Sequence, residues 1–267
     1  MKNSKKDNSH SFLSHVTAKS SHYDESAASY DVFNEENSSQ INSLVQNILQ
    51  QYHVKTVLDM TCGTGSQVFW LIKHGFNVVG SDINAKMLAI AKDKAQQKKI
   101  DVKFIEGDMR IVQVGKFDAV ITIFNAIGHL TKPDFELAIE NIWNNLNDKG
   151  LYIFDIFNLN YLLKGNNITK LTIDWQKRTD NITVRDIQYS IVDQGGVLAS
   201  YTITYIQSDD NKPQISQHEQ TLQIYTAAQL KDMLLQKGFK VVRQCSFDGS
   251  DVDDFETDRI ITVAQKI

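Results

Sequence analysis

The apolar residues of the chain follow two alternating patterns. In some stretches they recur every three or four residues, which is the period of a helix with one buried face. In others they form short runs rich in Val, Ile and Phe, which are typical of buried strands. The first pattern predicts helices at 39–52, 67–74, 84–98, 131–149 and 226–237. The second predicts strands at 56–60, 77–81, 102–105, 117–124 and 151–157.

This alternation gives way to strand patterns alone in the second half of the chain. Four strand-like runs, separated by Gly- and Asp-rich turns, cover 171–175, 182–192, 197–206 and 215–224. Closing strands are predicted at 239–247 and 259–265. Alternating strands and helices predict a doubly wound α/β fold around a parallel sheet, with the four runs as an antiparallel β insertion.

The same patterns divide the chain into three parts. Residues 1–22 are polar and lack a sustained period, so we expect a mobile tail. Residues 23–160 and 225–267 form the doubly wound domain. Residues 161–224 form the insertion, which we expect to act as a lid over a substrate.

Composition narrows the class of protein. The 267 residues carry a net charge of −4, which disfavours nucleic acid as a partner. Two cysteines are too few for a disulfide framework or a zinc cluster, so no metal is expected. No apolar run is long enough to cross a membrane, and no secretory signal follows the N-terminal lysines. We therefore expect a cytoplasmic protein, either a monomer or a homodimer.

The loop after the first strand carries the strongest chemical signal. The strand ends at Asp59, the chain turns through Gly63 and Gly65, and a helix follows. Glycine lets a ligand approach the backbone closely, and a helix start offers unpaired N–H groups. In a doubly wound sheet a nucleotide-like ligand binds at this position. An ordinary tight turn is the alternative, because two glycines alone are weak evidence.

Two further acids strengthen this interpretation. Asp82 ends the second strand, and Asp108 follows the third. Each alone could be a solvated cap or turn residue. Because successive parallel strands end at one edge of a sheet, Asp59, Asp82 and Asp108 are expected to converge there.

The chemistry of the loop disfavours a dinucleotide. Val68 stands where the dinucleotide fingerprint has its third glycine, and Asp59 would repel a pyrophosphate. A ligand with a ribose and a positive charge fits better. S-adenosylmethionine has a ribose, an ammonium and a sulfonium, and it has no phosphate.

The chain resembles class I S-adenosylmethionine-dependent methyltransferases, which have a Rossmann-like fold. The matching segments are VLDMTCGTGSQ, VVGSDINAKML, FIEGDMR and FDAVITIFNAIGHL. The segments GDMR, NAIGHL and HEQTLQIYTAAQLKDMLLQKGF also resemble small-molecule N-methyltransferases of the amino-sugar and glycine/sarcosine types. The resemblance runs from about Tyr23 to the C-terminus.

The resemblance implies the roles of the site residues. Asp59 and the backbone of Gly63 and Gly65 would face the methionine end of the cofactor, Asp82 the ribose hydroxyls and Asp108 the adenine amino group. The full set that it implies for cofactor binding is Tyr30, Asp59, Cys62, Gly63, Gly65, Asp82, Ile83, Met87, Asp108, Met109 and Phe124.

The resemblance also implies catalytic candidates. Asn125 would lie near the methyl group or the acceptor, and Tyr23, with Tyr30, matches a segment that covers the cofactor. His129 is the candidate base or orienting group, the alternative being a structural histidine before the next helix. His218 is a weaker candidate, with a surface strand position as its alternative.

Three functions remain open from the sequence. The preferred one is methyl transfer to a small molecule, at an amine nitrogen rather than an oxygen. The second is methylation of a protein or an RNA, which the acidic charge balance disfavours for RNA. The third is a regulatory protein that binds S-adenosylmethionine without catalysis.

Overall fold

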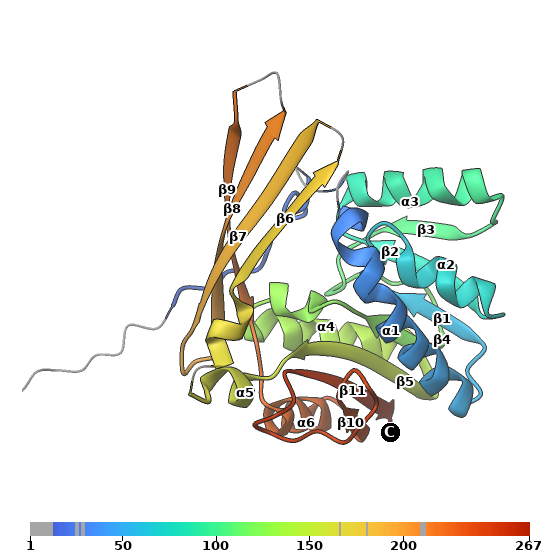
Figure 1. The fold of residues 1–267 in the computed structure, drawn as a ribbon. Helices are drawn as coiled ribbons and strands as arrows, with labels where there is room; N and C mark the ends of the chain where they lie inside the picture. The colour runs from blue at the N-terminus through green and yellow to red at the C-terminus, as the bar shows by residue number, and fades with distance from the viewer. Residues whose placement is uncertain (1–12, 25–26, 28–29, 166, 180, 209–211) are drawn as a thin grey trace, which may run out of the picture.

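The computed structural model describes residues 13–267 except 25–26, 28–29, 166, 180 and 209–211. A seven-stranded sheet with helices on both faces forms the main body, and a four-stranded sheet stands beside it (Figure 1). The main sheet comprises β1 (Thr56–Asp59), β2 (Asn77–Asp82), β3 (Lys103–Glu106), β4 (Phe117–Thr122), β5 (Leu146–Phe157), β10 (Phe239–Cys245) and β11 (Arg259–Lys266). The helices are α1 (Tyr30–Gln51), α2 (Ser66–Lys73), α3 (Ala85–Lys98), α4 (Lys132–Asn144), α5 (Leu159–Leu163) and α6 (Ala227–Gln236), with 3-10 turns η1 (Ala126–His129) and η2 (Asn167–Leu171).

The strand order of the main sheet is β10-β11-β5-β4-β1-β2-β3. Strands β1 to β5 are parallel, as predicted, and the order reverses between β1 and β4. Ligands of such sheets bind at the carboxyl ends of the strands, where the order reverses. The sheet differs from a purely parallel one at β11, which runs antiparallel to both of its neighbours. No helix lies in the described residues between β10 and β11, so the chain reverses direction and the two strands pair antiparallel.

Two apolar clusters hold the sheet between its helices. One contains the buried face of α1, with Ile41, Val45 and Ile48, together with side chains of α2 and α3. The other lies on the opposite face and joins α4 and α6 to β5. Both faces of the central strands are therefore buried, which explains their nearly continuous apolar sequences.

The insertion predicted in the second half of the chain is confirmed as a separate antiparallel sheet. Its strands are β6 (Ile173–Thr179), β7 (Ile182–Val192), β8 (Val197–Ser208) and β9 (Gln214–Gln223), in that order. Leu198 and Leu222, at the base of this sheet, are buried in the same apolar cluster as α4 and α6. The insertion is therefore joined to the main body through a shared core.

The N-terminal segment makes contacts that the sequence did not predict. We predicted a mobile tail over residues 1–22, of which 1–12 lie outside the described residues. From Leu13 onward the segment is bonded to the rest of the protein. The Leu13 N–H donates to Asp193 at 2.7 Å, and the Ala18 N–H donates to the His129 carbonyl at 2.8 Å. The polar composition concealed these contacts because they use hydrogen bonds rather than an apolar face.

Helix α1 also begins earlier than predicted, at Tyr30 rather than Ser39. The added residues are mostly polar and carry no apolar period, so the pattern did not reveal them. Among the described helices, none has the length and apolar character needed to cross a bilayer.

Candidate active site

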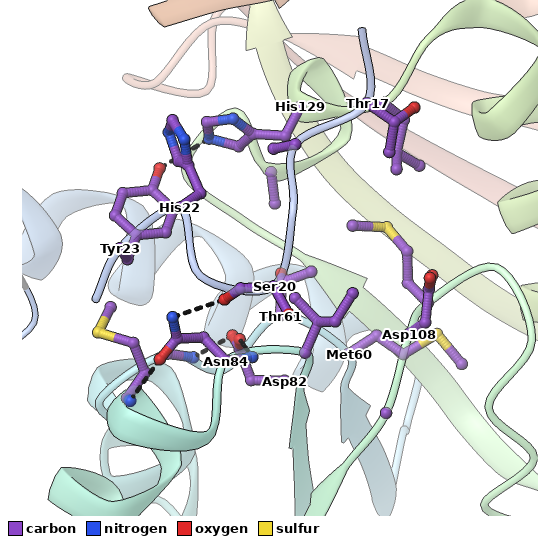
Figure 2. A pocket seen from close by; sticks show the side chains of 18 of the residues that line it. Thr17, Ser20, His22, Tyr23, Met60, Thr61, Asp82, Asn84, Asp108 and His129 are labelled. Atoms are coloured by element: carbon purple, nitrogen blue, oxygen red, sulfur yellow. Dashed lines mark hydrogen bonds between the residues drawn. The ribbon is translucent and has the colours of Figure 1, made fainter. Parts of the chain in front are cut away.

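A pocket lies at the carboxyl ends of the parallel strands, beneath the N-terminal segment (Figure 2). Its floor is the turn between β1 and α2. Gly63 and Gly65 have φ values of 51° and 92°, which glycine adopts without strain. A Cβ atom on Gly65 would lie 2.7 Å from the Phe69 ring. The turn therefore depends on glycine at this position for both conformation and space.

Asp82 ties the first two strand ends together. Its Oδ2 accepts a hydrogen bond from the Gly63 N–H at 2.8 Å, and its Oδ1 accepts from the Asn84 N–H at 2.8 Å. Burial raises the pKa of Asp82, and these backbone donors oppose that rise. Since each carboxylate oxygen can accept two bonds, Asp82 retains acceptor capacity toward the pocket that it lines.

Asp59 lies deeper. It is 1% exposed, and its Oδ1 accepts from the Thr61 N–H at 3.2 Å. Its Oδ2 is buried without a hydrogen-bond partner among the described residues. Burial, with a smaller contribution from the charge of Asp82, raises its pKa to about 8. The pocket is lined by Met60 and Thr61, and Asp59 lies outside that lining.

Asp108 is already engaged by a side chain that the sequence reasoning did not single out. The Nε of Arg110 lies 3.0 Å from each carboxylate oxygen, and its Nη2 lies 2.5 Å from Oδ2. Arg110 also reaches Asp134 at 3.0 Å. Burial would raise the pKa of Asp108, but the bonds and charge of Arg110 outweigh it and lower the pKa. Bonding to adenine would therefore require Asp108 to share its oxygens with Arg110.

Tyr23 and His129 meet at the top of the pocket. The Tyr23 hydroxyl lies 2.7 Å from His129 Nε2, and the His22 ring lies beside both (Figure 2). Burial, followed by the charges of His22 and His15, lowers the pKa of His129 to about 3. His129 is therefore a neutral imidazole near pH 7. His218, on β9, has its ring 5.6 Å from that of His22 and its residue is exposed.

Asn125 is placed differently from the other candidates. Its Oδ1 accepts from the Phe157 N–H at 3.0 Å, so its side chain is bonded to β5. It is 8% exposed and does not line the pocket. The preceding residue, Phe124, does line it. A direct role of Asn125 at the acceptor stays a prediction that this hydrogen bond does not favour.

The predicted site residues fall into two groups, those that line the pocket and those that do not. The structure places nine predicted residues in the pocket lining: Tyr23, Gly63, Asp82, Ile83, Met87, Asp108, Met109, Phe124 and His129. Cys62 and Gly65 lie in the turn below it, and burial raises the pKa of the Cys62 thiol well above its ordinary value. The side chain of Tyr30 lies outside the described part of the chain.

Several pocket residues escaped the sequence reasoning. Thr17, Ala18, Lys19 and Ser20 cover the pocket from the N-terminal segment. Asn84 holds that segment, because its Nδ2 donates to the Ser20 carbonyl at 2.7 Å and to Asp24 at 2.9 Å. Asn84 stands at the start of a predicted helix, but its contacts with residues 60 and 64 positions away were not visible in the sequence.

The residues present fit S-adenosylmethionine. Asp82 offers carboxylate acceptors at the pocket wall, and Asp59 has a buried carboxylate oxygen without a partner among the described residues. Arg110 is paired with two acids, and Lys19 is an exposed residue, so no built phosphate site is found in the described lining. A ribose with a cationic tail suits this set of donors and acceptors better than a pyrophosphate.

Comparison with known proteins gives a methyltransferase match over part of the chain. Residues 57–150 match the family described as "Methyltransferase domain". A glycine/sarcosine N-methyltransferase of Parasynechococcus marenigrum is 33% identical over 122 residues, which cover 44% of this chain and 43% of that relative. The chain spans under half the length of the first curated relatives that it matches.

Solved structures agree over more of the chain. An S-adenosylmethionine-dependent methyltransferase from Clostridium acetobutylicum has a TM-score of 0.74 at 18% identity, covering 91% of this chain and 98% of its own. An amino pentose methyltransferase from Micromonospora echinaspora, solved with S-adenosylmethionine bound, has a TM-score of 0.70 at 19% identity, covering 85% and 90%. At these identities the likeness shows the fold.

Fold and pocket together define an α/β protein with a nucleotide-type site at the reversal of its strand order. Residues 57–150 match a methyltransferase domain, and most of the chain shares the fold of an S-adenosylmethionine-dependent methyltransferase.

Proposed function

We propose that the protein transfers the methyl group of S-adenosylmethionine to an amine nitrogen of a small molecule. The observation that carries the proposal is the pair of acids at the ends of β1 and β2, buried Asp59 and half-buried Asp82, beside the reversal of the strand order. Similarity to a glycine/sarcosine N-methyltransferase and to the fold of an amino pentose methyltransferase supports a small amine as the acceptor.

The cofactor, when bound, supplies a methyl group activated by a positively charged sulfur. The protein then has to align the acceptor and exclude water. Asp82 is positioned to accept hydrogen bonds from ribose hydroxyls, because Gly63 and Asn84 fix its carboxylate at the pocket wall. Charge-assisted bonds of this kind contribute about 1.5–3 kcal/mol each.

We infer that Tyr23 and His129, which line the pocket and contact each other, receive the acceptor. With a pKa of about 3, His129 is a poor store for a proton at neutral pH. We infer that it orients the Tyr23 hydroxyl through their 2.7 Å contact and does not act as a strong base. An amine acceptor suits a site without a strong base, because a neutral amine can attack the methyl carbon first and release its proton to solvent afterwards, whereas a hydroxyl group needs a base during the attack.

Closure of the pocket supports a small acceptor over a macromolecule. The N-terminal segment covers the site and is bonded to Asn84, His129 and Asp134. A protein or RNA chain would have to displace these contacts to reach the pocket.

Calorimetric titration with S-adenosylmethionine and with NAD tests the proposal. We expect micromolar binding of S-adenosylmethionine alone, and a loss of at least tenfold in affinity in Asp82→Ala. Asp101→Ala, which removes an exposed acid, should bind like the wild type.

Formation of S-adenosylhomocysteine with glycine, sarcosine or an amino sugar, and not with the matching hydroxyl compounds, would support nitrogen as the target. Binding without turnover on any amine would favour a regulatory protein. Binding of NAD in place of S-adenosylmethionine would contradict the proposal.

A further inference from the structure

Two non-glycine residues at the end of β4 adopt a left-handed backbone. Phe124 has φ of 68° and Asn125 has φ of 55°. Consecutive residues in this region are uncommon, and a bulky aromatic side chain is especially disfavoured there. Such a turn persists only where its surroundings hold it, and it occurs often at functional sites. The contacts of this turn therefore identify what holds it.

The support comes from Asp155, in the neighbouring strand β5. Its Oδ1 accepts from the Phe124 N–H at 2.6 Å, and its Oδ2 accepts from the Asn125 N–H at 3.2 Å. One carboxylate thus binds both consecutive N–H groups of the turn. The Asp155 side chain has no exposed surface and does not line the pocket.

Arg259, at the start of β11, supplies the countercharge. Its Nη1 lies 3.4 Å from Asp155 Oδ2. Its guanidinium lies over the rings of Phe157 and Phe247, with 4.5 and 4.9 Å to their centroids. These rings hold the guanidinium in place, so a strand distant in sequence compensates the buried carboxylate.

The turn determines the geometry of the pocket wall. Phe124 lines the pocket directly, and η1, which begins at Ala126, carries His129 to the contact with Tyr23. Asn125 closes the arrangement by accepting from the Phe157 N–H on β5. A change in the turn would therefore move both Phe124 and His129.

We infer that Asp155 and Arg259 are positioning residues of the active site, which hold the Phe124–Asn125 turn so that Phe124 and His129 face the pocket. Neither residue touches the pocket, and both act through the turn. The inference rests on the proposed function only in the experiment that measures cofactor binding.

The test compares Asp155→Asn with a matched control on the same two strands. An asparagine amide can accept from only one of the two N–H groups and places a donor against the other. The control is Tyr152→Phe, which removes the buried 2.8 Å contact between Tyr152 and Thr122 across β5 and β4 without altering the turn. Arg259→Lys and Arg259→Gln complete the series, and they remain informative if Asp155→Asn does not fold.

Two measurements are made on the full chain: calorimetric affinity for S-adenosylhomocysteine, and amide hydrogen exchange at Phe124 and Asn125 by NMR. We expect Asp155→Asn to lose about tenfold in affinity, Arg259→Gln about threefold, and Arg259→Lys less than twofold. Exchange at the two amides should accelerate at least tenfold in Asp155→Asn while distant amides change little. Tyr152→Phe should keep wild-type affinity, whatever its melting temperature.

Wild-type affinity in both Asp155→Asn and Arg259→Gln would overturn the inference, as would an equal loss in Tyr152→Phe. If the wild type itself fails to bind S-adenosylhomocysteine, the proposed function fails. In that case the hydrogen-exchange measurement by itself tests the inference. Unchanged exchange at Phe124 and Asn125 in the variants would overturn it.

Discussion

Asp59 illustrates how a single residue can be unfavourable for stability and suited to binding. The fold buries its carboxyl group, leaves Oδ2 without a partner among the described residues and raises the pKa to about 8. In the unfolded chain the pKa would be near 3.8. Between these two pH values the native state holds a proton that the unfolded state has lost. The free energy of unfolding therefore falls as the pH rises through this window.

Replacement of Asp59 by asparagine removes this titration. Compared with Asp59→Asn, the wild type should lose up to about 1.4 kcal/mol of unfolding free energy per pH unit between pH 5 and 8. The variant should also bind S-adenosylmethionine at least tenfold more weakly, because an amide, unlike the Asp59 carboxyl group, cannot give up a proton to balance the cationic methionine end of the cofactor. Urea denaturation at several pH values, with Asp101→Asn as the control, measures the first effect. Parallel pH profiles for wild type and Asp59→Asn would contradict the argument.

The acids that end the strands were predictable residue by residue, and their partners were not. Asp82 and Asp108 follow apolar runs, so both appear in the pattern of the chain. The pairing of Asp155 with Arg259 joins residues 104 positions apart, and no local pattern reveals it. Asp155 and Arg259 also lie in runs that predict strands, and nothing in those runs marks either residue as part of a site. Side-chain pairing of this kind depends on the register of β5 with β11, which only the folded sheet provides.

At the scale of elements, local rules worked where the signal was local. Asn84, Thr131 and Thr226 cap α3, α4 and α6 with side-chain hydrogen bonds, as their positions in the sequence indicate. The N-terminal segment has no such signal. From Leu13 onward it is held by long-range hydrogen bonds, which the prediction of a mobile tail did not include.

Thr17 anchors this segment and provides a prediction. Its hydroxyl donates to the Asp134 carboxylate and accepts from the Thr131 N–H at 3.0 Å. Thr17→Val keeps the shape of the side chain but removes both bonds. We expect the segment to detach more often and S-adenosylhomocysteine to dissociate several-fold faster, while the melting temperature changes little.

Stopped-flow fluorescence and limited proteolysis between residues 13 and 24 measure the two consequences of Thr17→Val. Ser14→Ala, at an exposed position in the same segment, is the matched control. Equal dissociation rates in Thr17→Val and the wild type would show that the segment is not a lid on the pocket.

At the scale of the whole molecule, the two sheets share one core. Leu198 and Leu222, from β8 and β9, pack in the cluster that also contains Phe135 of α4 and Leu230 of α6. The upper part of the insertion stands clear of the main body (Figure 1). Its base is therefore the connection through which the insertion and the main body stabilise each other.

This shared core predicts that the insertion and the main body unfold together. Leu222→Ala should lower the free energy of unfolding by about 2–5 kcal/mol, because it leaves a cavity between the sheets. Ile215→Ala, on the same strand but 64% exposed, should change it by under about 0.5 kcal/mol.

Trp175 reports on the insertion and Trp143 on the main body, so variants that retain one tryptophan follow each part during urea denaturation. Coincident transitions that shift together in Leu222→Ala would confirm one cooperative unit. A separate early transition at Trp175 would show that the insertion is an independent module, and the pocket would then have to form without it.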